Sequence, residues 1–266
     1  MPNAVVMLRE NPHYRRDGFI AGLAANGYSV KGAVAAPTPD DVLVVWNRYG
    51  ETHTEAMRWT KAGARVIVAE NGYMGRDWRG GIWYSMAMNW HMGRGQWNVG
   101  GPERAVELFG EPAPWRFEDG PVVVLGQRGI GAPSVIAPSG WANNVVRDLQ
   151  SQRIPAVLRP HPGNDPDQAG LDKALFRARA AATWSSGAGI KAILGGVPVY
   201  YGLPQWIGAQ AAQAYTRPLL LPFIGDRSVF MQRLSWAMWE LGEISCGRSF
   251  DHLLCRPEET LLRRIV

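Results

Sequence analysis

Two kinds of segment alternate along this 266-residue chain, and this alternation limits the possible fold more than any other feature. Short runs of β-branched and other apolar residues, typical of buried strands, are followed by segments with apolar residues at helical spacing. The first part of the chain predicts strands at Ala4–Leu8, Tyr28–Val34, Val42–Trp46 and Arg65–Ala69, with helices at Arg15–Asn26 and Thr52–Ala62. Such an order is typical of a parallel sheet covered by helices.

The alternation restarts in the second part of the chain. It predicts strands at Pro121–Leu125, Ala156–Arg159, Ala182–Ser185 and Val197–Tyr201, and helices at Ser139–Gln152, Leu171–Ala180, Gly187–Leu194 and Arg227–Gly242. The first part ends in a short predicted helix at Pro102–Phe109. The stretch Gly110–Gly120 contains prolines and acidic residues and is interpreted as a linker. We therefore expect an α/β protein with two Rossmann-like halves facing across a cleft, one over residues 1–115 and one over residues 116–266.

The composition is that of a globular protein with a basic surface. Apolar residues make up 46% of the chain and charged residues 19%, and the net charge is +5. That charge fits a polyanionic partner such as nucleic acid or a phosphate-bearing ligand, and it equally fits a soluble basic protein without such a partner. The two cysteines lack metal-ligand spacing, and no apolar run is long enough to span a bilayer, so we expect a cytoplasmic protein.

Three strand ends of the second half carry residues suited to binding an anion. The loop Gly126-Gln127-Arg128-Gly129 can bring backbone amides and a guanidinium to a phosphate. In Arg159-Pro160-His161-Pro162 the prolines stiffen the backbone around an imidazole, and Ser185-Ser186-Gly187 precedes a helix. Each motif also has an ordinary structural explanation: a glycine-rich turn, a histidine in a rigid turn, and capping of the helix by Ser186.

As an ordered set, these motifs resemble the second half of GT-B glycosyltransferases of the capsule-polysaccharide-synthesis type, which includes the Kdo transferases. The resemblance covers Pro121 to Gly202 and ends in the strand motif Gly196-Val197-Pro198-Val199. It implies a nucleotide-sugar donor held by the second half, with His161 and the pair Ser185 and Ser186 on its phosphates. The donor-binding residues that follow from this resemblance and from the loops are Gly126, Gln127, Arg128, Gly129, Arg159, His161, Ser185, Ser186, Gly187 and Lys191.

One position departs from the resemblance. Many GT-B proteins carry a glutamate in the helix after the serine loop, where it holds the donor ribose. In this sequence Lys191 is the charged residue nearest that place. The identity of the nucleotide is therefore open, and a contact between Lys191 and a phosphate is an alternative.

The first half would then hold the acceptor. Glu70 follows a predicted strand and suits the role of base for the acceptor hydroxyl, with Asp77 and His91 as rivals. A carboxylate that bonds only to its own turn at Asn71-Gly72 is an equal alternative. The catalytic residues expected are Glu70 and His161. Arginines and aromatic rings that could grip a phosphate backbone or stack on a base or sugar are Arg15, Arg76, Trp78, Trp90, His91, Arg94 and Trp97. A self-packed aromatic loop is the competing explanation.

The sequence leaves three functions open. The first is transfer of a sugar to a hydroxymethylated pyrimidine in double-stranded DNA, as in phage-type enzymes that share the GT-B fold, which would place the protein in the cytoplasm of a bacterial host. The second is surface or capsular polysaccharide synthesis, and the third is a non-catalytic binding module. Because fixed hydrogen-bond donors could stabilise the leaving phosphate, we expect transfer without a metal and without a cofactor, and no membrane partner.

Overall fold

The computed structural model describes residues 1–91, 95–131, 135–163 and 170–254. Within this part, the chain forms two compact units, each with its own sheet. Unit 1 contains Met1–Gly101 and the described residues from Ser235 onward, and unit 2 is Pro102–Leu234. The predicted α/β class with two Rossmann-like halves is confirmed.

The sheet of unit 1 has six strands in the order β11-β5-β4-β3-β1-β2. The first four strands in the sequence pair in parallel, whereas β5 and β11 are antiparallel additions to one edge. The bounds are Asn3–Met7 (β1), Ser29–Lys31 (β2), Val42–Trp46 (β3), Arg65–Asn71 (β4), Trp83–Met88 (β5) and Met238–Glu240 (β11).

Helices cover both faces of this sheet, because alternate strand residues point to opposite sides. On one face, Ile67 and its neighbours pack against Phe19 of α1 and Phe250 of α9. On the other face, Val66 and Val68 pack against Trp59 of α2. The helices of unit 1 are Arg16–Ala25 (α1), Glu51–Lys61 (α2), Leu241–Ser245 (α8) and Arg248–Leu254 (α9), with 3-10 turns at Pro12–Tyr14 (η1) and Trp78–Gly80 (η2).

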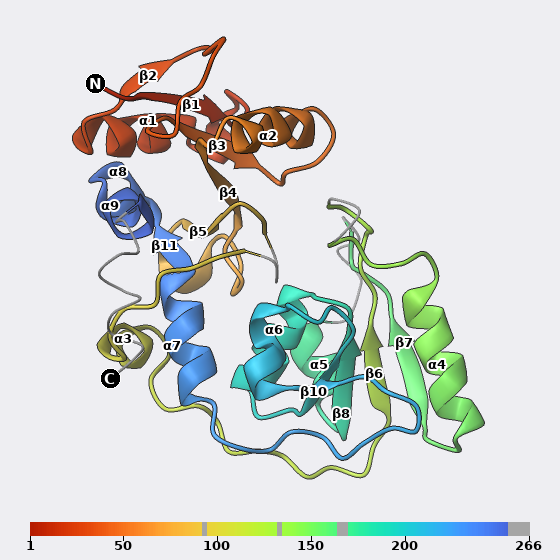
Figure 1. The fold of residues 1–266 in the computed structure, drawn as a ribbon. Helices are drawn as coiled ribbons and strands as arrows, with labels where there is room; N and C mark the ends of the chain where they lie inside the picture. Colours follow the sequence, from red (N-terminus) through yellow and green to blue (C-terminus); the bar gives the residue numbers. More distant parts are fainter. Residues whose placement is uncertain (92–94, 132–134, 164–169, 255–266) are drawn as a thin grey trace, which may run out of the picture. The chain divides into compact units, whose positions relative to one another are not determined.

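Unit 2 contains a parallel sheet of five strands in the order β10-β9-β8-β6-β7. The strands are Val122–Leu125 (β6), Ala156–Arg159 (β7), Ala180–Thr183 (β8), Val199–Tyr201 (β9) and Gln213–Ala214 (β10). The helices are Glu103–Phe109 (α3), Trp141–Ser151 (α4), Leu171–Leu175 (α5), Gly187–Leu194 (α6) and the 3-10 helix Ile207–Ala211 (η3). Figure 1 shows α4 on one side of the sheet and α6 on the other.

The end of the chain differs from the expectation of one long helix over Arg227–Gly242. Helix α7 spans Ser228–Trp236, and the chain then forms β11, which pairs with β5. Strand β5 itself lies between the predicted strand Arg65–Ala69 and the predicted helix Pro102–Phe109, where the sequence pattern predicted no regular element. Because β11 belongs to the sheet of unit 1, the chain divides after Gly101 and again after Leu234, rather than once after residue 115.

Smaller differences concern the ends of elements in unit 2. Strand β8 begins at Ala180, two residues before the predicted start, and the helix expected over Leu171–Ala180 ends at Leu175. Helix α4 follows Gly140 in a left-handed conformation (φ 71°), so Ser139 does not cap it. Ser186 does cap α6, as predicted: its side chain accepts a hydrogen bond from the amide of Ala188.

Gly22 provides a stability test of unit 1, because a Cβ at this position of α1 would lie 1.9 Å from the carbonyl oxygen of Ile244 in α8. Gly22→Ala should therefore force the helices apart and lower the free energy of unfolding by about 1–3 kcal/mol. Urea denaturation followed by circular dichroism measures the change. Gly242→Ala is the matched control, because nothing lies within 4 Å of its Cβ position. Equal stability of Gly22→Ala and Gly242→Ala would contradict the close helix contact.

Candidate functional site

The three motifs of unit 2 that the sequence predicts to bind an anion start at the same edge of its sheet. Leu125 at the end of β6 pairs with Arg159 of β7 on one side and with Thr183 of β8 on the other. Because all three strands are parallel, their following loops leave from neighbouring positions. The amide of Gly126 donates to the Arg159 carbonyl at 2.8 Å. A Cβ at Gly126 would lie 3.2 Å from the backbone nitrogen of His161, so glycine allows the close approach of these two loops.

The side chain of Gln127 joins the first loop to the third. Its Oε1 accepts a hydrogen bond from the Ser185 amide at 2.8 Å, and its Nε2 donates to Ser185 Oγ at 3.3 Å. Ser185 is 1% exposed. Gln127 and Ser185 thus hold the loops together, and their polar atoms are largely engaged with each other rather than turned toward a ligand.

Ser186 and the start of α6 form the part of the third loop that can reach an anion. The Ser186 amide donates to Thr183 Oγ1 at 3.0 Å, and Ser186 Oγ accepts from the amide of Ala188 at 3.1 Å. These bonds fix the first turn of the helix. The positive end of the helix dipole therefore points out of the same edge of the sheet as the other two loops.

His161 follows β7 with an exposed side chain. Its Nδ1 accepts a hydrogen bond from the amide of Gly163 at 2.8 Å, which assigns the proton of the neutral imidazole to Nε2. Partial desolvation, together with the positive charges of Arg128 and Arg159, lowers the pKa of His161 below its usual value. His161 is thus a neutral donor with two cations beside it, a combination that suits a phosphate.

Trp184 is a further residue of this site that the sequence motifs did not single out. Its indole nitrogen donates to the carbonyl of Val135 at 3.0 Å, and its ring meets that of Trp141 edge to face. A Cβ on Gly202 would lie 2.3 Å from the Trp184 ring, so a side chain there would displace it. Trp184 thereby joins the segment between β8 and α6 to Val135 and to the start of α4.

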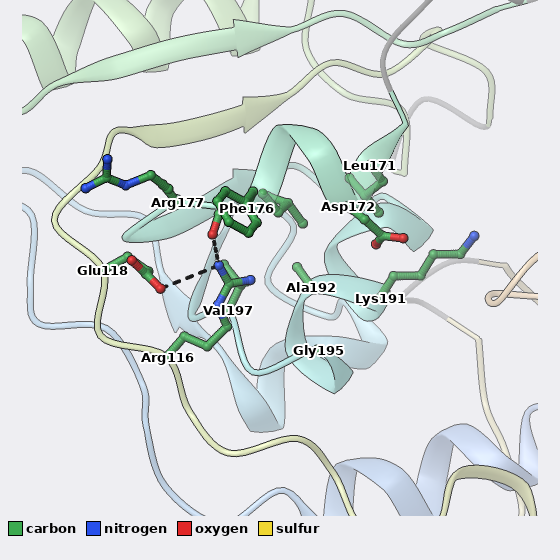
Figure 2. Close-up of a pocket in the computed structure, with 11 residues that line it drawn as sticks. Arg116, Glu118, Leu171, Asp172, Phe176, Arg177, Lys191, Ala192, Gly195 and Val197 are labelled. Carbon is green, nitrogen blue, oxygen red and sulfur yellow. Dashed lines mark hydrogen bonds and ion pairs between the residues drawn. The ribbon is translucent and has the colours of Figure 1, made fainter.

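A groove of about 630 Å³ lies between α5 and α6 of unit 2. Figure 2 shows Asp172 of α5 and Lys191 of α6 at this groove, with Leu171, Ala192 and Val197 among its apolar lining. Arg116 is held at its rim by Glu118 and by the carbonyl of Phe176. The phosphate is expected at the start of α6, near Gly187. Lys191 lies four residues later, so the groove begins about 6 Å further along the helix axis.

In unit 1, Glu70 lies near the carboxyl end of β4, on the sheet face that carries Val66 and Val68. Its side chain is 14% exposed, and its Oε1 lies 3.9 Å from Nε2 of His91. Burial raises the pKa of Glu70 to about 8. A carboxyl group with such a pKa is suited to exchanging a proton near neutral pH.

His91 lies in the segment after β5 and is 3% exposed. Burial and the nearby charge of Arg48 lower its pKa to about 4, so the imidazole is neutral at pH 7. Arg48 donates to the carbonyl of Asn89, and its guanidinium lies 3.9 Å from the centre of the Trp90 ring. Of the residues expected on the acceptor side, Trp90 and His91 therefore lie in one cluster with Glu70.

The remaining residues expected to bind the acceptor are distributed differently. Arg76 contacts His13 of η1, and Trp78 packs edge to face on Trp83. Arg15 is exposed, and its backbone has a left-handed conformation (φ 47°). Trp97 is a core residue, 9% exposed, with its indole nitrogen bonded to the Met86 carbonyl at 2.9 Å. Arg94 lies outside the described residues.

The described residues contain no group of three or more His, Cys, Asp or Glu side chains that could hold a metal ion. Transfer without a metal stays a prediction. Within the same ranges, no helix has both the length and the hydropathy needed to cross a bilayer.

No protein-family model matches this sequence, and a search of curated proteins found no match either. Solved structures do share its fold. The structure titled Thermosulfurimonas dismutans KpsC, beta Kdo 2,7 transferase, matches with a TM-score of 0.52 over 94% of this chain and 99% of its own, at 13% identity. The beta Kdo 2,4 transferase of the same protein matches with a TM-score of 0.50 over 88% of this chain and 89% of its own, also at 13% identity. The predicted structural resemblance to Kdo transferases is therefore confirmed at the level of the fold.

The raised pKa of Glu70 leads to a test by the pH dependence of stability. The folded state keeps the Glu70 proton up to about pH 8, whereas an unperturbed carboxyl loses it near pH 4.5. The stability that this proton provides is therefore lost as the pH rises between these values. His91 has the opposite effect, but only between about pH 4 and 6.5, so the range from pH 6.5 to 8 isolates Glu70.

Glu70→Gln should remove the decline in stability between pH 6.5 and 8 and leave the protein a few kcal/mol more stable above pH 8. Urea denaturation at a series of pH values measures this. Glu51→Gln, at an exposed glutamate of α2, is the control and should keep the wild-type slope. A wild-type protein whose stability does not fall across this range would contradict the raised pKa.

Proposed function

We propose that this protein is a glycosyltransferase that moves a sugar from a nucleotide-sugar donor to a hydroxyl group of a saccharide in surface or capsular polysaccharide synthesis. The observation that carries the proposal is the convergence of three loops at one sheet edge of unit 2. The three loops leave the sheet at adjacent points because Leu125 pairs with both Arg159 and Thr183. The fold shared with two Kdo transferase structures supports the same reaction class.

In this proposal, unit 2 holds the donor. Its phosphate accepts hydrogen bonds from Nε2 of His161 and from the start of α6, with Arg128 nearby to balance its charge. The nucleoside occupies the groove between α5 and α6, which has apolar walls for a base and the carboxylate of Asp172 for ribose hydroxyls. Gln127, Ser185 and Trp184 hold the loops rather than the donor.

Glu70 of unit 1 acts as the base in the proposed reaction. The acceptor hydroxyl gives its proton to the Glu70 carboxylate while its oxygen attacks the anomeric carbon of the donor. The bond from that carbon to the phosphate oxygen breaks, and the phosphate leaves with the electron pair. His161 and Arg128 stabilise the negative charge that develops on the leaving phosphate.

The polysaccharide function has better support than transfer to DNA. The titles of both matching structures name Kdo transferases, which act on a sugar, and the fold match covers both units. The DNA hypothesis rested on the basic charge and on the mixture of arginine and tryptophan between residues 76 and 97. In the structure, Trp97 is a core residue and Trp90 packs under Arg48, which reduces the aromatic surface available to a base.

Transfer can be tested by incubating the protein with a panel of sugar nucleotides that includes nucleotide-activated Kdo, using oligosaccharides and hydroxymethylated DNA as acceptors. We expect a mass increase on a saccharide. His161→Ala should lower kcat/KM by about 100-fold, because the leaving phosphate loses a fixed donor, and Arg128→Ala should lower it by about 10-fold. Arg147→Ala, at an exposed position of α4, is the control and should keep full activity. Products on DNA alone would contradict the proposal.

The nucleoside position can be tested separately from transfer. Asp172→Ala should weaken binding of the cognate nucleoside monophosphate by about 10-fold in calorimetry, because the ribose loses a charged acceptor. Lys191→Ala should weaken it as well. Asp251→Ala, at an exposed position of α9 in unit 1, serves as the control. Unchanged affinity in both groove variants would place the nucleoside elsewhere.

A further inference from the structure

We infer that Asn47, which no sequence motif pointed to, is a positioning residue that orients the Glu70 carboxyl for proton transfer. The inference rests on the proposed function, because Glu70 is the base in that reaction. Asn47 directly follows β3, and Glu70 is near the end of the neighbouring strand β4. The two residues meet because Trp46 pairs with Ala69 in the parallel sheet.

The contacts of the Asn47 side chain define this role. With its amide turned so that the nitrogen faces the carboxyl, Nδ2 donates to Oε1 of Glu70, and the amide oxygen accepts from the indole nitrogen of Trp46 at 3.2 Å. The Asn47 backbone is also anchored, since its amide donates to the Ala69 carbonyl at 3.2 Å. Asn47 is thus held at both ends and presents one donor to one carboxylate oxygen.

The backbone of Asn47 explains why an asparagine suits this position. Its φ is 60°, in the left-handed region that glycine and asparagine tolerate better than other residues. This conformation ends β3 and turns the following residue, Arg48, inward, where it is 1% exposed. Asparagine therefore provides a hydrogen-bond donor in a backbone conformation that would be strained for most other residues.

The remaining surroundings of Glu70 leave its second oxygen for the substrate. His91, from the segment after β5, lies 3.9 Å from Oε1, the same oxygen that Asn47 contacts. Among the described residues, Arg48 is a further charged group near this cluster, and its charge acts on His91. None of the residues that the structure describes donates a hydrogen bond to Oε2 of Glu70. Asn47 on Oε1 therefore directs Oε2 toward an acceptor hydroxyl.

The hydrogen bond also sets the proton affinity of Glu70. A donor to a carboxylate stabilises its charged form and so opposes the effect of burial on the pKa. Removing the Asn47 side chain should raise the pKa of Glu70 further. Replacing the amide with a carboxylate of the same shape should raise it more, because a second negative charge would then lie beside Glu70.

Asn47→Gly and Asn47→Asp test this inference, since both residues tolerate a positive φ and should keep the fold. The Glu70 carboxyl is titrated by NMR in protein labelled with ¹³C at the glutamate carboxyl carbons, and Glu70→Gln assigns its signal. We expect a wild-type pKa of about 8, an increase of about one unit in Asn47→Gly and a larger one in Asn47→Asp. Asn89→Gly is the matched control: Asn89 has a φ of 65°, and its side chain bonds to Gln96.

Activity supplies the second measurement. The rise of kcat/KM with pH should move by the same amount as the NMR titration in each variant, whereas KM for the donor should stay within about twofold, because Asn47 belongs to unit 1. A Glu70 titration unchanged in both Asn47 variants would overturn the inference even if transfer is observed. A shifted titration without any transfer would support the placement of Asn47 and contradict the proposed function instead.

Discussion

The pairing of three parallel strands in unit 2 is the constraint on which the candidate donor site depends. Leu125 lies between Arg159 and Thr183, so three loops with little sequence in common leave the sheet at adjacent points. Gln127 then bonds to Ser185 across the gap, and Trp184 bonds to Val135. Without this register, the imidazole and the start of α6 would not lie at one edge of the sheet, and each alone is an ordinary turn or a capped helix.

In unit 1, neighbouring strand ends bring together titratable groups rather than loops. The ends of β3 and β4 bring Asn47 beside Glu70, and the segment after β5 adds His91. Burial shifts the two titratable groups in opposite directions, raising the pKa of Glu70 to about 8 and lowering that of His91 to about 4. Both groups are therefore uncharged near neutral pH, which spares the sheet face a buried charge and leaves Glu70 close to the pH at which it can take a proton.

Much of the fold could be predicted from local patterns. The apolar runs at Val42–Trp46 and Arg65–Ala69 correspond to β3 and β4, and the serine cap of α6 was recognised from its sequence. Strand β5 and strand β11 were not recognised. Strand β5 pairs with β4 on one side and with β11 on the other. Strand β11 lies about 150 residues after β5 in the chain, and the local sequence of neither strand indicates this distant partner.

The α/β class and the order of the predicted donor-site motifs follow from local properties of the chain, namely helical and strand periodicity and loop composition. The availability of each polar atom in those motifs depends instead on long-range packing. Gln127, predicted to line the donor site, has its amide engaged with Ser185, whereas Asn47, absent from every motif, contacts Glu70. Side-chain partners across neighbouring strands depend on register and burial, and these are set by the packing of the whole unit.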